Sequence, residues 1–465
     1  MNNSAKIISR TLFLAGCFLA GQLHANVSTE PAAAAAATAP APVAVSVEEV
    51  MEKTSTSTAD HSKFDELKKD FKSGQEVTKA CLTCHTEAAK QVHNTKHWTW
   101  EFLNPETKQK LGKKNVVNNF CTSVTSNQTF CSACHIGYGW KDDKFDFTSE
   151  NNVDCVVCHD TTGKYKKLPG LSGHPNYEKM EWPPHSGKFR EATDLKTIAQ
   201  KVGKTSRASC GACHFYGGGG DAVKHGDLDS SLKQPQKYLD VHMDAKGLDF
   251  SCGKCHLSDS HEVTGSRYAP TAVDDKGALI RGNRDGRNPT TCVACHGNSP
   301  HPQGTAAVEK LNSHTDKIAC QTCHIPAFAR GNKATKMTWD WSTAGKLDEK
   351  GQRIRKRGSG GEVIYDSKKG DFTFERYVIP EYGVFNGDVK YTLFGDRVDT
   401  NDIVKINEFQ GAADDQTLAS GQSRLSVANS PMTLVTKPLQ CSILQARMML
   451  PSGATMTGTK PWNVV

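Results

Sequence analysis

Seven copies of Cys-x-x-Cys-His are the residues of this sequence best suited to chemistry. Two cysteines at this spacing can form two thioethers to a porphyrin, and the histidine that follows can ligate the iron. Zinc knuckles also use Cys-x-x-Cys, but they do not require a histidine directly after the second cysteine. We therefore interpret the motifs as attachment sites for haem c. The sites are Cys81, Cys84 and His85; Cys131, Cys134 and His135; Cys155, Cys158 and His159; Cys210, Cys213 and His214; Cys252, Cys255 and His256; Cys292, Cys295 and His296; and Cys320, Cys323 and His324.

Other histidines can complete these irons, because a low-spin electron-transfer haem needs a second axial ligand, commonly histidine. Ten histidines remain outside the motifs and the N-terminal segment that contains His24. We rank His61 last, since it lies in a polar stretch, and do not include it. His93 and His97 are four residues apart, so one helical turn can present them to two different haems. The predicted distal ligands are His93, His97, His174, His185, His225, His242, His261, His301 and His314.

The N-terminal segment has the pattern of an export signal. Residues 1–25 carry Lys6 and Arg10, the apolar run "TLFLAGCFLAG" and then "LHA", as in a signal peptide cut after Ala25. "LAGC" also resembles a lipoprotein cleavage box, but the apolar run continues past Cys17. Residues 26–70 form an Ala/Pro-rich linker that we expect to be disordered. No other segment approaches the roughly 20 apolar residues of a membrane helix, so we expect an exported, soluble, periplasmic protein.

The rest of the chain predicts a domain organised around haems. Only 37% of the residues are hydrophobic, which is little for a conventional core, and the haems would supply the missing apolar volume. We predict a mainly α fold with extensive loops and covalent haems as its core, over residues 71–324. Residues 325–415 lack the motif and contain "GEVIYD", "DFTFERYVIPEY" and "VKYTLFGD". We expect a haem-free packing segment here, with short strands near 355–400.

The charge balance does not favour a nucleic-acid partner. The formal net charge is +7. Each haem carries two propionates, so seven haems would add about fourteen negative charges and make the holoprotein roughly neutral or acidic. Many lysines and arginines would then pair with propionates.

Several long strings resemble the octahaem tetrathionate reductase family. They are "KHWTWEFLNPETKQKLGKKNVVNNFC", "CSACHIGYGW", "NNVDCVVCHDTTGKYKK", "PEYGVFNGDVKYTLFGD" and "DIVKINEFQGAADD", within a match from about residue 75 to Asp415. The resemblance implies a periplasmic reductase that passes electrons through bis-histidine haems to one lysine-ligated catalytic haem. It implies tetrathionate, and also nitrite and hydroxylamine, as electron acceptors. From spacing alone, the lysines after the third motif would be solvated.

The resemblance also implies roles for individual residues. The family's lysine ligand lies shortly after the third motif and serves the second haem, which corresponds here to Lys167 opposite His135, with Lys164 and Lys166 as alternatives. A lysine amine ligates iron only when it is neutral. Cys121 lies outside the motifs and is a candidate thiol near the catalytic haem; the alternative is a buried structural cysteine.

The resemblance stops after Asp415, and residues 416–465 lack the eighth motif that an octahaem family requires. Back-translation of this tail in a shifted frame gives a peptide that contains Trp, Tyr, His and Asp. We therefore interpret the tail as out of frame, after a frameshift near residue 415; the alternative is a variable tail. Cys441 would then be no ligand. We expect a seven-haem product to be unstable.

Two functions remain open at this stage. The first is a reductase for a small inorganic anion, supplied with electrons by a periplasmic or membrane-bound donor cytochrome or quinol dehydrogenase. The second is an electron-transfer cytochrome in which every iron carries two histidines. A haem-based sensor is not favoured, because nothing in the sequence resembles a signalling domain.

Overall fold

The computed structural model describes residues 57–104, 107–117, 124, 127–217, 220–221, 228–265, 292–297, 299–302, 304–315, 318–385, 389–397, 399, 405–409 and 424–428. All of them belong to one compact unit, Ser46–Val465. The predicted signal peptide, Cys121, His225 and most of the predicted tail lie outside the described residues. Within the described part of the chain, no helix has the length and apolar character needed to cross a bilayer.

The folded chain begins before residue 71, so the predicted linker boundary was wrong. Two 3-10 turns, η1 (His61–Lys63) and η2 (Asp65–Leu67), precede the first α-helix. The side chain of Asp60 caps η1 by accepting a hydrogen bond from the Ser62 N–H. Leu67 is buried and joins a core cluster with Val77. This single apolar contact in a polar stretch has no periodicity, which is why the sequence pattern did not reveal it.

Short helical turns form at the motifs, and polar caps set where several of them begin. Helix α2 (Gly74–Leu82) reaches the first motif and starts at Ser73, whose hydroxyl accepts from the Glu76 N–H. Helix α8 (Arg207–His214) contains the fourth motif and starts with a capping box at Ser206. The other motif turns are α5 (Gln128–Cys131) with η3 (Ser132–Cys134), α6 (Val156–His159), η6 (Cys252–Lys254), α9 (Cys292–His296) and α11 (Cys320–His324).

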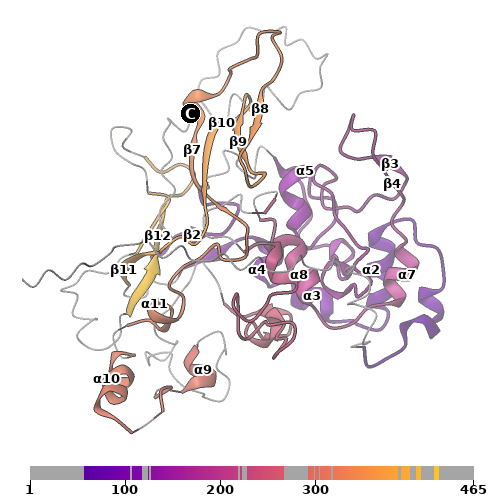
Figure 1. Ribbon diagram of the computed structural model, residues 1–465. Helices are drawn as coiled ribbons and strands as arrows, with labels where there is room; N and C mark the ends of the chain where they lie inside the picture. Colours follow the sequence, from indigo (N-terminus) through magenta and orange to yellow (C-terminus); the bar gives the residue numbers. More distant parts are fainter. Residues whose placement is uncertain are drawn as a thin grey trace, which may run out of the picture. The chain divides into compact units, whose positions relative to one another are not determined.

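Short connecting elements surround the motif turns (Figure 1). The helical ones are α3 (Ala88–His93), α4 (Lys96–Thr99), η4 (Glu150–Asn152), α7 (Leu195–Gln200), η5 (Ser230–Lys233) and α10 (Ala306–His314). Three short antiparallel pairs have strands of two residues each: β1 (Phe102–Leu103) with β2 (Lys110–Leu111), β3 (Met180–Glu181) with β4 (Phe189–Arg190), and β5 (Ser258–Asp259) with β6 (Glu262–Val263). The fold is thus only modestly helical, and the prediction of a mainly α chain overstated its helix content.

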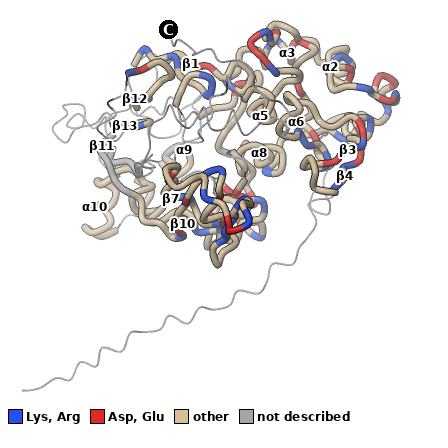
Figure 2. Tube along the Cα trace, turned by 90° about the horizontal axis from the view of Figure 1, so that it is seen from above, with Lys and Arg blue, Asp and Glu red and all other residues tan. Residues whose placement is uncertain are grey.

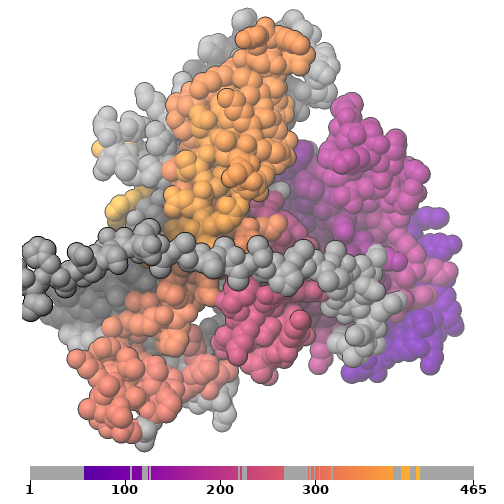
Figure 3. All heavy atoms as spheres, viewed as in Figure 1, coloured from indigo at the N-terminus to yellow at the C-terminus, as the bar shows by residue number. Residues whose placement is uncertain are grey.

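The strands predicted after residue 325 are confirmed. Four of them form an antiparallel sheet in the order β7-β10-β9-β8. Their bounds are β7 (Thr335–Asp340), β8 (Arg355–Arg357), β9 (Val363–Asp366) and β10 (Gly370–Glu375), which share one part of the surface (orange in Figure 3). Trp339 stacks on Trp341 at 4.3 Å between ring centres, and Phe372 lies beside them. The turn η7 (Trp341–Thr343) follows β7 directly, and its N-cap Asp340 accepts a hydrogen bond from the Ser342 N–H.

Two further strand pairs follow. β11 (Glu381–Phe385) pairs with β14 (Arg424–Ala428), which falls in the segment assigned from the sequence to the out-of-frame tail. β12 (Val389–Tyr391) pairs with β13 (Asn407–Phe409). Val389 and Tyr391 pack on Leu111 and Val116, ahead of the second motif. The haem-free segment therefore supports the chain that leads into that motif. Along the described chain, basic and acidic residues are interspersed (Figure 2).

Candidate haem-binding and redox site

Five motif histidines each face a histidine from another part of the chain. The ring centres lie 6.5 Å apart for His85 and His61, 6.4 Å for His159 and His261, 6.2 Å for His214 and His97, 5.9 Å for His296 and His242, and 6.1 Å for His324 and His301. The distances are nearly constant, although the angle between ring planes varies from 14° to 78°. Direct ring packing would couple distance to angle, so the constant gap indicates that something else sets it.

An iron ion fits this gap. Metal–imidazole bonds of about 2 Å, with about 1.2 Å from each nitrogen to its ring centre, place two ring centres about 6.4 Å apart across a metal. The hydrogen bonds of the rings agree with ligation. His159 Nδ1 donates to Gly203 O at 2.8 Å, and His256 Nδ1 donates to Thr264 O at 2.9 Å. A bond from Nδ1 to a carbonyl fixes the tautomer in which Nε2 is free for a metal.

The distal partners are held in the same way. His261 Nδ1 lies 2.8 Å from Gln91 Oε1, and His301 Nδ1 lies 3.1 Å from Asn312 Oδ1. Both amide oxygens can only accept, so each ring presents Nε2 to the opposite histidine. The Nδ1 contacts of the motif histidine His159 and of the distal histidines His261 and His301 therefore leave Nε2 of each ring for an iron.

His61 is the residue that the sequence reasoning missed. It faces His85 with nearly parallel rings, at 14°. The available signal was Asp60 before it, because an aspartate followed by a short polar turn is a cap that orders the chain. Four predicted distal histidines, His97, His242, His261 and His301, lie opposite a motif histidine.

The other predicted distal ligands lie elsewhere. His93 stacks on Trp98 at 4.7 Å, and its Nε2 is buried without a hydrogen-bond partner in the described structure. His174 stacks on Tyr138 and bonds Tyr177. His185 and His314 are exposed. No described ring faces His256, and His225 lies outside the described residues.

The second motif differs from the five paired ones. Among the described residues, no histidine faces His135. Its ring is fully buried among aromatic side chains, 5.1 Å from Trp98 and 4.8 Å from Trp140. Burial, followed by the charge of Lys167, lowers the pKa of His135 to about 3, so its imidazole is neutral. Its Nε2 bonds Trp98 O at 2.7 Å, while Nδ1 is buried without a partner. The donor type suits an iron, but ligation through Nε2 requires the ring to leave this carbonyl.

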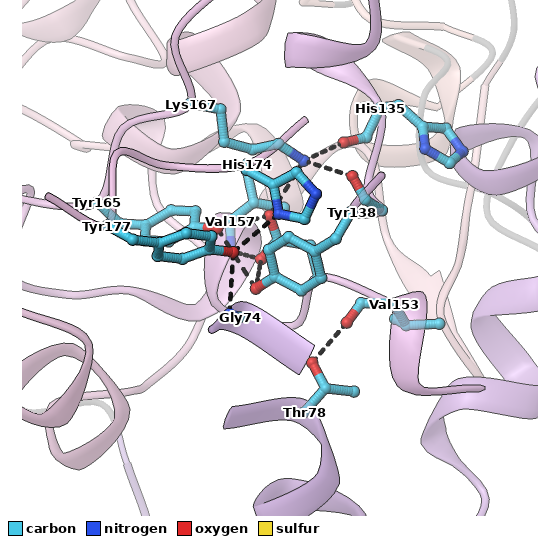
Figure 4. A network of polar contacts seen from close by, with 12 residues as sticks. Gly74, Thr78, His135, Tyr138, Val153, Val157, Tyr165, Lys167, His174 and Tyr177 are labelled. Atoms are coloured by element: carbon cyan, nitrogen blue, oxygen red, sulfur yellow. Dashed lines mark hydrogen bonds and ion pairs between the residues drawn. The ribbon is translucent and has the colours of Figure 1, made fainter. Parts of the chain in front are cut away.

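Of the three candidate lysines, only Lys167 reaches the second motif. Its side chain is 2% exposed. Its Nζ donates to His135 O at 2.5 Å and to Gly137 O at 3.0 Å, and forms an ion pair with Asp154 Oδ2 at 3.0 Å (Figure 4). Lys164 and Lys166 are exposed. The chain thus places one buried amine beside the backbone of the only motif histidine that is enclosed by aromatic rings in the described structure.

Neighbouring motifs touch through their cysteines. The Cys155 thiol lowers the pKa of Cys81, and the Cys252 thiol raises the pKa of Cys210, so the two cysteines of each pair lie close together. The Cys134 thiol of the second motif raises the pKa of Cys213 in the fourth, so these two motifs are also neighbours. All fourteen motif cysteines lack disulfides, which leaves them available for thioether bonds. Haems attached at neighbouring motifs would lie close to one another, which favours electron transfer between them.

Comparison with known proteins places these features in a family. Three family descriptions match: "Cytochrome c bacterial" over residues 336–433, "Outer membrane cytochrome MtrC/MtrF-like, domains II/IV" over 123–308, and "Cytochrome c554 and c-prime" over 80–160. The crystal structure of octahaem cytochrome c from Shewanella oneidensis is 40% identical, with a TM-score of 0.64, and the match covers 79% of this chain and 73% of that one. This chain belongs to the octahaem cytochrome c family of the tetrathionate reductase type.

A curated relative is an uncharacterised protein of Archaeoglobus fulgidus. It is 26% identical over 275 residues, which cover 50% of this chain and 90% of the relative. Membership of the octahaem family confirms the prediction of covalently bound haem c and a redox function in electron transfer.

Proposed function

We propose that this cytochrome is a periplasmic reductase of tetrathionate, with nitrite and hydroxylamine as further acceptors. The observation that carries the proposal is the contrast between the motifs. Five motif histidines face a second histidine at the spacing of a saturated iron. His135 faces no histidine of the described part of the chain, and the Lys167 amine is buried beside it. Catalysis requires an iron with an exchangeable position, and a lysine is a weaker partner than a second histidine.

The haem at the second motif would be held by Cys131, Cys134 and His135, with Lys167 as its exchangeable ligand, and it would supply electrons to the bound anion. Tetrathionate takes up two electrons, its central sulfur–sulfur bond breaks, and two thiosulfates leave. Lys113 supports anion binding here: its Nζ lies 4.6 Å from the centre of the Trp100 ring, and its charge lowers the pKa of His135. A half-buried cation beside the motif would attract the dianion and stabilise charge on the departing sulfur.

The test compares Lys167→Met with Lys166→Met, a matched change of the exposed neighbour. Each purified holoprotein is assayed for tetrathionate, nitrite and hydroxylamine reduction with a reduced viologen as donor. We expect Lys166→Met to behave as wild type and Lys167→Met to change both the turnover and the absorbance spectrum of one haem. A wild-type protein that reduces none of the three acceptors and binds no cyanide would instead favour the alternative, an electron-transfer cytochrome. We propose a periplasmic or membrane-bound cytochrome or quinol dehydrogenase as electron donor, and no nucleic-acid partner.

A further inference from the structure

A hairpin directly after the fifth motif carries the distal ligand of the third haem. Its strands are β5 and β6, which pair antiparallel. The Thr264 N–H closes the base of the hairpin by donating to Leu257 O at 2.9 Å. We name residues 257–264 the ligand hairpin. His261 lies in its two-residue turn and faces His159 of the third motif, with 6.4 Å between the ring centres.

The turn of the ligand hairpin has a backbone that its residues do not favour. Ser260 and His261 both have positive φ angles, of 47° and 67°. Hairpin turns with two positive φ angles favour Asn-Gly or Asp-Gly, because a β-carbon is crowded in this conformation. Such backbone strain persists where the surrounding structure holds it, and it is concentrated at functional positions. The turn itself gains nothing from a histidine, so the position of the His261 ring is what the strained backbone provides.

Two side chains from α3 and α4 hold this turn. His261 Nδ1 donates to Gln91 Oε1 at 2.8 Å, which fixes the plane of the ring and leaves Nε2 for the iron. Lys96 forms an ion pair with Glu262, the residue that follows His261. The Lys96 amine also lies 5.4 Å from the centre of the Phe102 ring. One contact therefore orients the ligand, and the other fixes the strand that leads away from it.

The base of the ligand hairpin serves a second haem. His256 Nδ1 donates to Thr264 O at 2.9 Å, so the last residue of the hairpin orients the proximal ligand of the fifth motif. Thr264 also bonds Leu257 through its side chain, since its hydroxyl donates to Leu257 O at 2.9 Å. Because the paired strands connect base and tip, a displacement of the tip reaches the base.

We propose that Gln91 and Lys96 are positioning residues that hold one hairpin for two haems. The tip of the hairpin supplies the distal ligand of the third haem, and its base orients the proximal ligand of the fifth. The two haems are then coupled through the protein, so loosening the hairpin changes both. This coupling concerns electron transfer and does not depend on the acceptor or on the role of Lys167.

The first test changes Gln91 in two opposite directions and follows the third haem by redox titration of the holoprotein. The low-spin resonance that His261→Ala removes identifies this haem. Gln91→Met removes the acceptor and makes the imidazole a weaker iron ligand, so the reduction potential should rise. Gln91→Glu provides a stronger acceptor, so the potential should fall. Shifts in the same direction, or no shift at full haem content, would show that Gln91 does not act through the ligand.

The second test exchanges the charges of the Lys96–Glu262 pair. Lys96→Glu should change the titration of two of the haems, and the double variant with Glu262→Lys should restore both. Lys90→Glu is the matched control, since Lys90 on α3 pairs with Glu87 instead, at 2.9 Å; it should titrate as wild type. A change at one haem only would overturn the shared role of the hairpin. A change in the resonance that His97→Ala removes would assign the effect to α4, which contains His97, and would also overturn it.

Discussion

Replacement of His61 by alanine tests the assignment of the first iron site. His61 lies in a 3-10 turn ahead of the first motif and faces His85 at 6.5 Å. If it ligates the iron, its loss leaves that iron with one strong axial ligand. A ferric haem without a second strong ligand becomes high spin, because the ligand field weakens. The variant should gain one high-spin iron per chain and retain all its covalent haems.

The ring angles give the size of the low-spin change. His61 with His85, and His301 with His324, have nearly parallel planes at 14° and 16°. The other three pairs cross at 65° to 78°. Parallel and crossed imidazole planes give ferric haems different g anisotropy, so the five sites divide into two and three. His61→Ala should remove the low-spin signal of one of the two haems with nearly parallel imidazole planes, which is half of that signal. The low-spin signals of the three haems with crossed planes should stay unchanged.

The assay is electron paramagnetic resonance with spin integration, taken as the difference between variant and wild type so that the unpaired motifs cancel. His97→Ala is the matched control, since it should remove one crossed-type spin instead. Loss of a crossed-type spin from His61→Ala, or no loss of low-spin signal at full haem content, would refute the assignment and the use of ring spacing as a sign of ligation.

Three other predictions concern stability and cofactor content. Gly74→Ala should destabilise the protein by about 1–3 kcal/mol in urea unfolding, because a Cβ there would lie 2.3 Å from the buried Tyr138 ring. Asp366→Asn should weaken the β9–β10 region by about 1–2 kcal/mol, measured by hydrogen exchange. Burial alone would raise the pKa of Asp366. The hydrogen bonds from Arg353 and the Lys368 N–H, together with the charge of Arg355, lower it by more, so the net shift of the pKa is downward. The contribution of Asp366 is thus complete above the unfolded pKa of about 3.9 and disappears as the pH falls through the folded value; hydrogen exchange that differs equally at pH 7 and pH 3 would contradict this. Intact-mass measurement should find seven haems on this chain, and cells that cannot attach haem should not accumulate it, since five iron sites join distant segments.

The sequence was sufficient for features that depend on local spacing. Each motif is a local unit, and a helical turn is needed to bring its two cysteines and its histidine to one face. The strands after residue 325 alternate between buried and exposed side chains and were also predictable: in β10, Gly370 and Phe372 are buried, whereas Thr373 and Glu375 are exposed. Histidine pairs depend instead on the tertiary fold. His159 meets His261, more than a hundred residues away, and nothing in either neighbourhood specifies the partner.

Asp154 shows a different limit of sequence reasoning. It stands directly before Cys155, and a single acidic residue there is indistinguishable from a solvated surface group. Its partners are three residues that approach from both sides of the chain: Tyr138 from after the second motif, and Tyr165 and Lys167 from after the third. Only the fold brings two tyrosine hydroxyls and an amine to one buried carboxylate.

The proximity of cysteines from different motifs shows which haem attachment sites are neighbours. Motif two touches motif four through Cys134 and Cys213, and motif four touches motif five through Cys210 and Cys252. Motif one touches motif three through Cys81 and Cys155. The fourth haem would therefore connect the second to the later motifs, while its own iron is enclosed by His97 and His214. Under the proposed function, the saturated fourth site would only pass electrons, and substrate would bind at the second motif, where Lys167 would be the exchangeable partner.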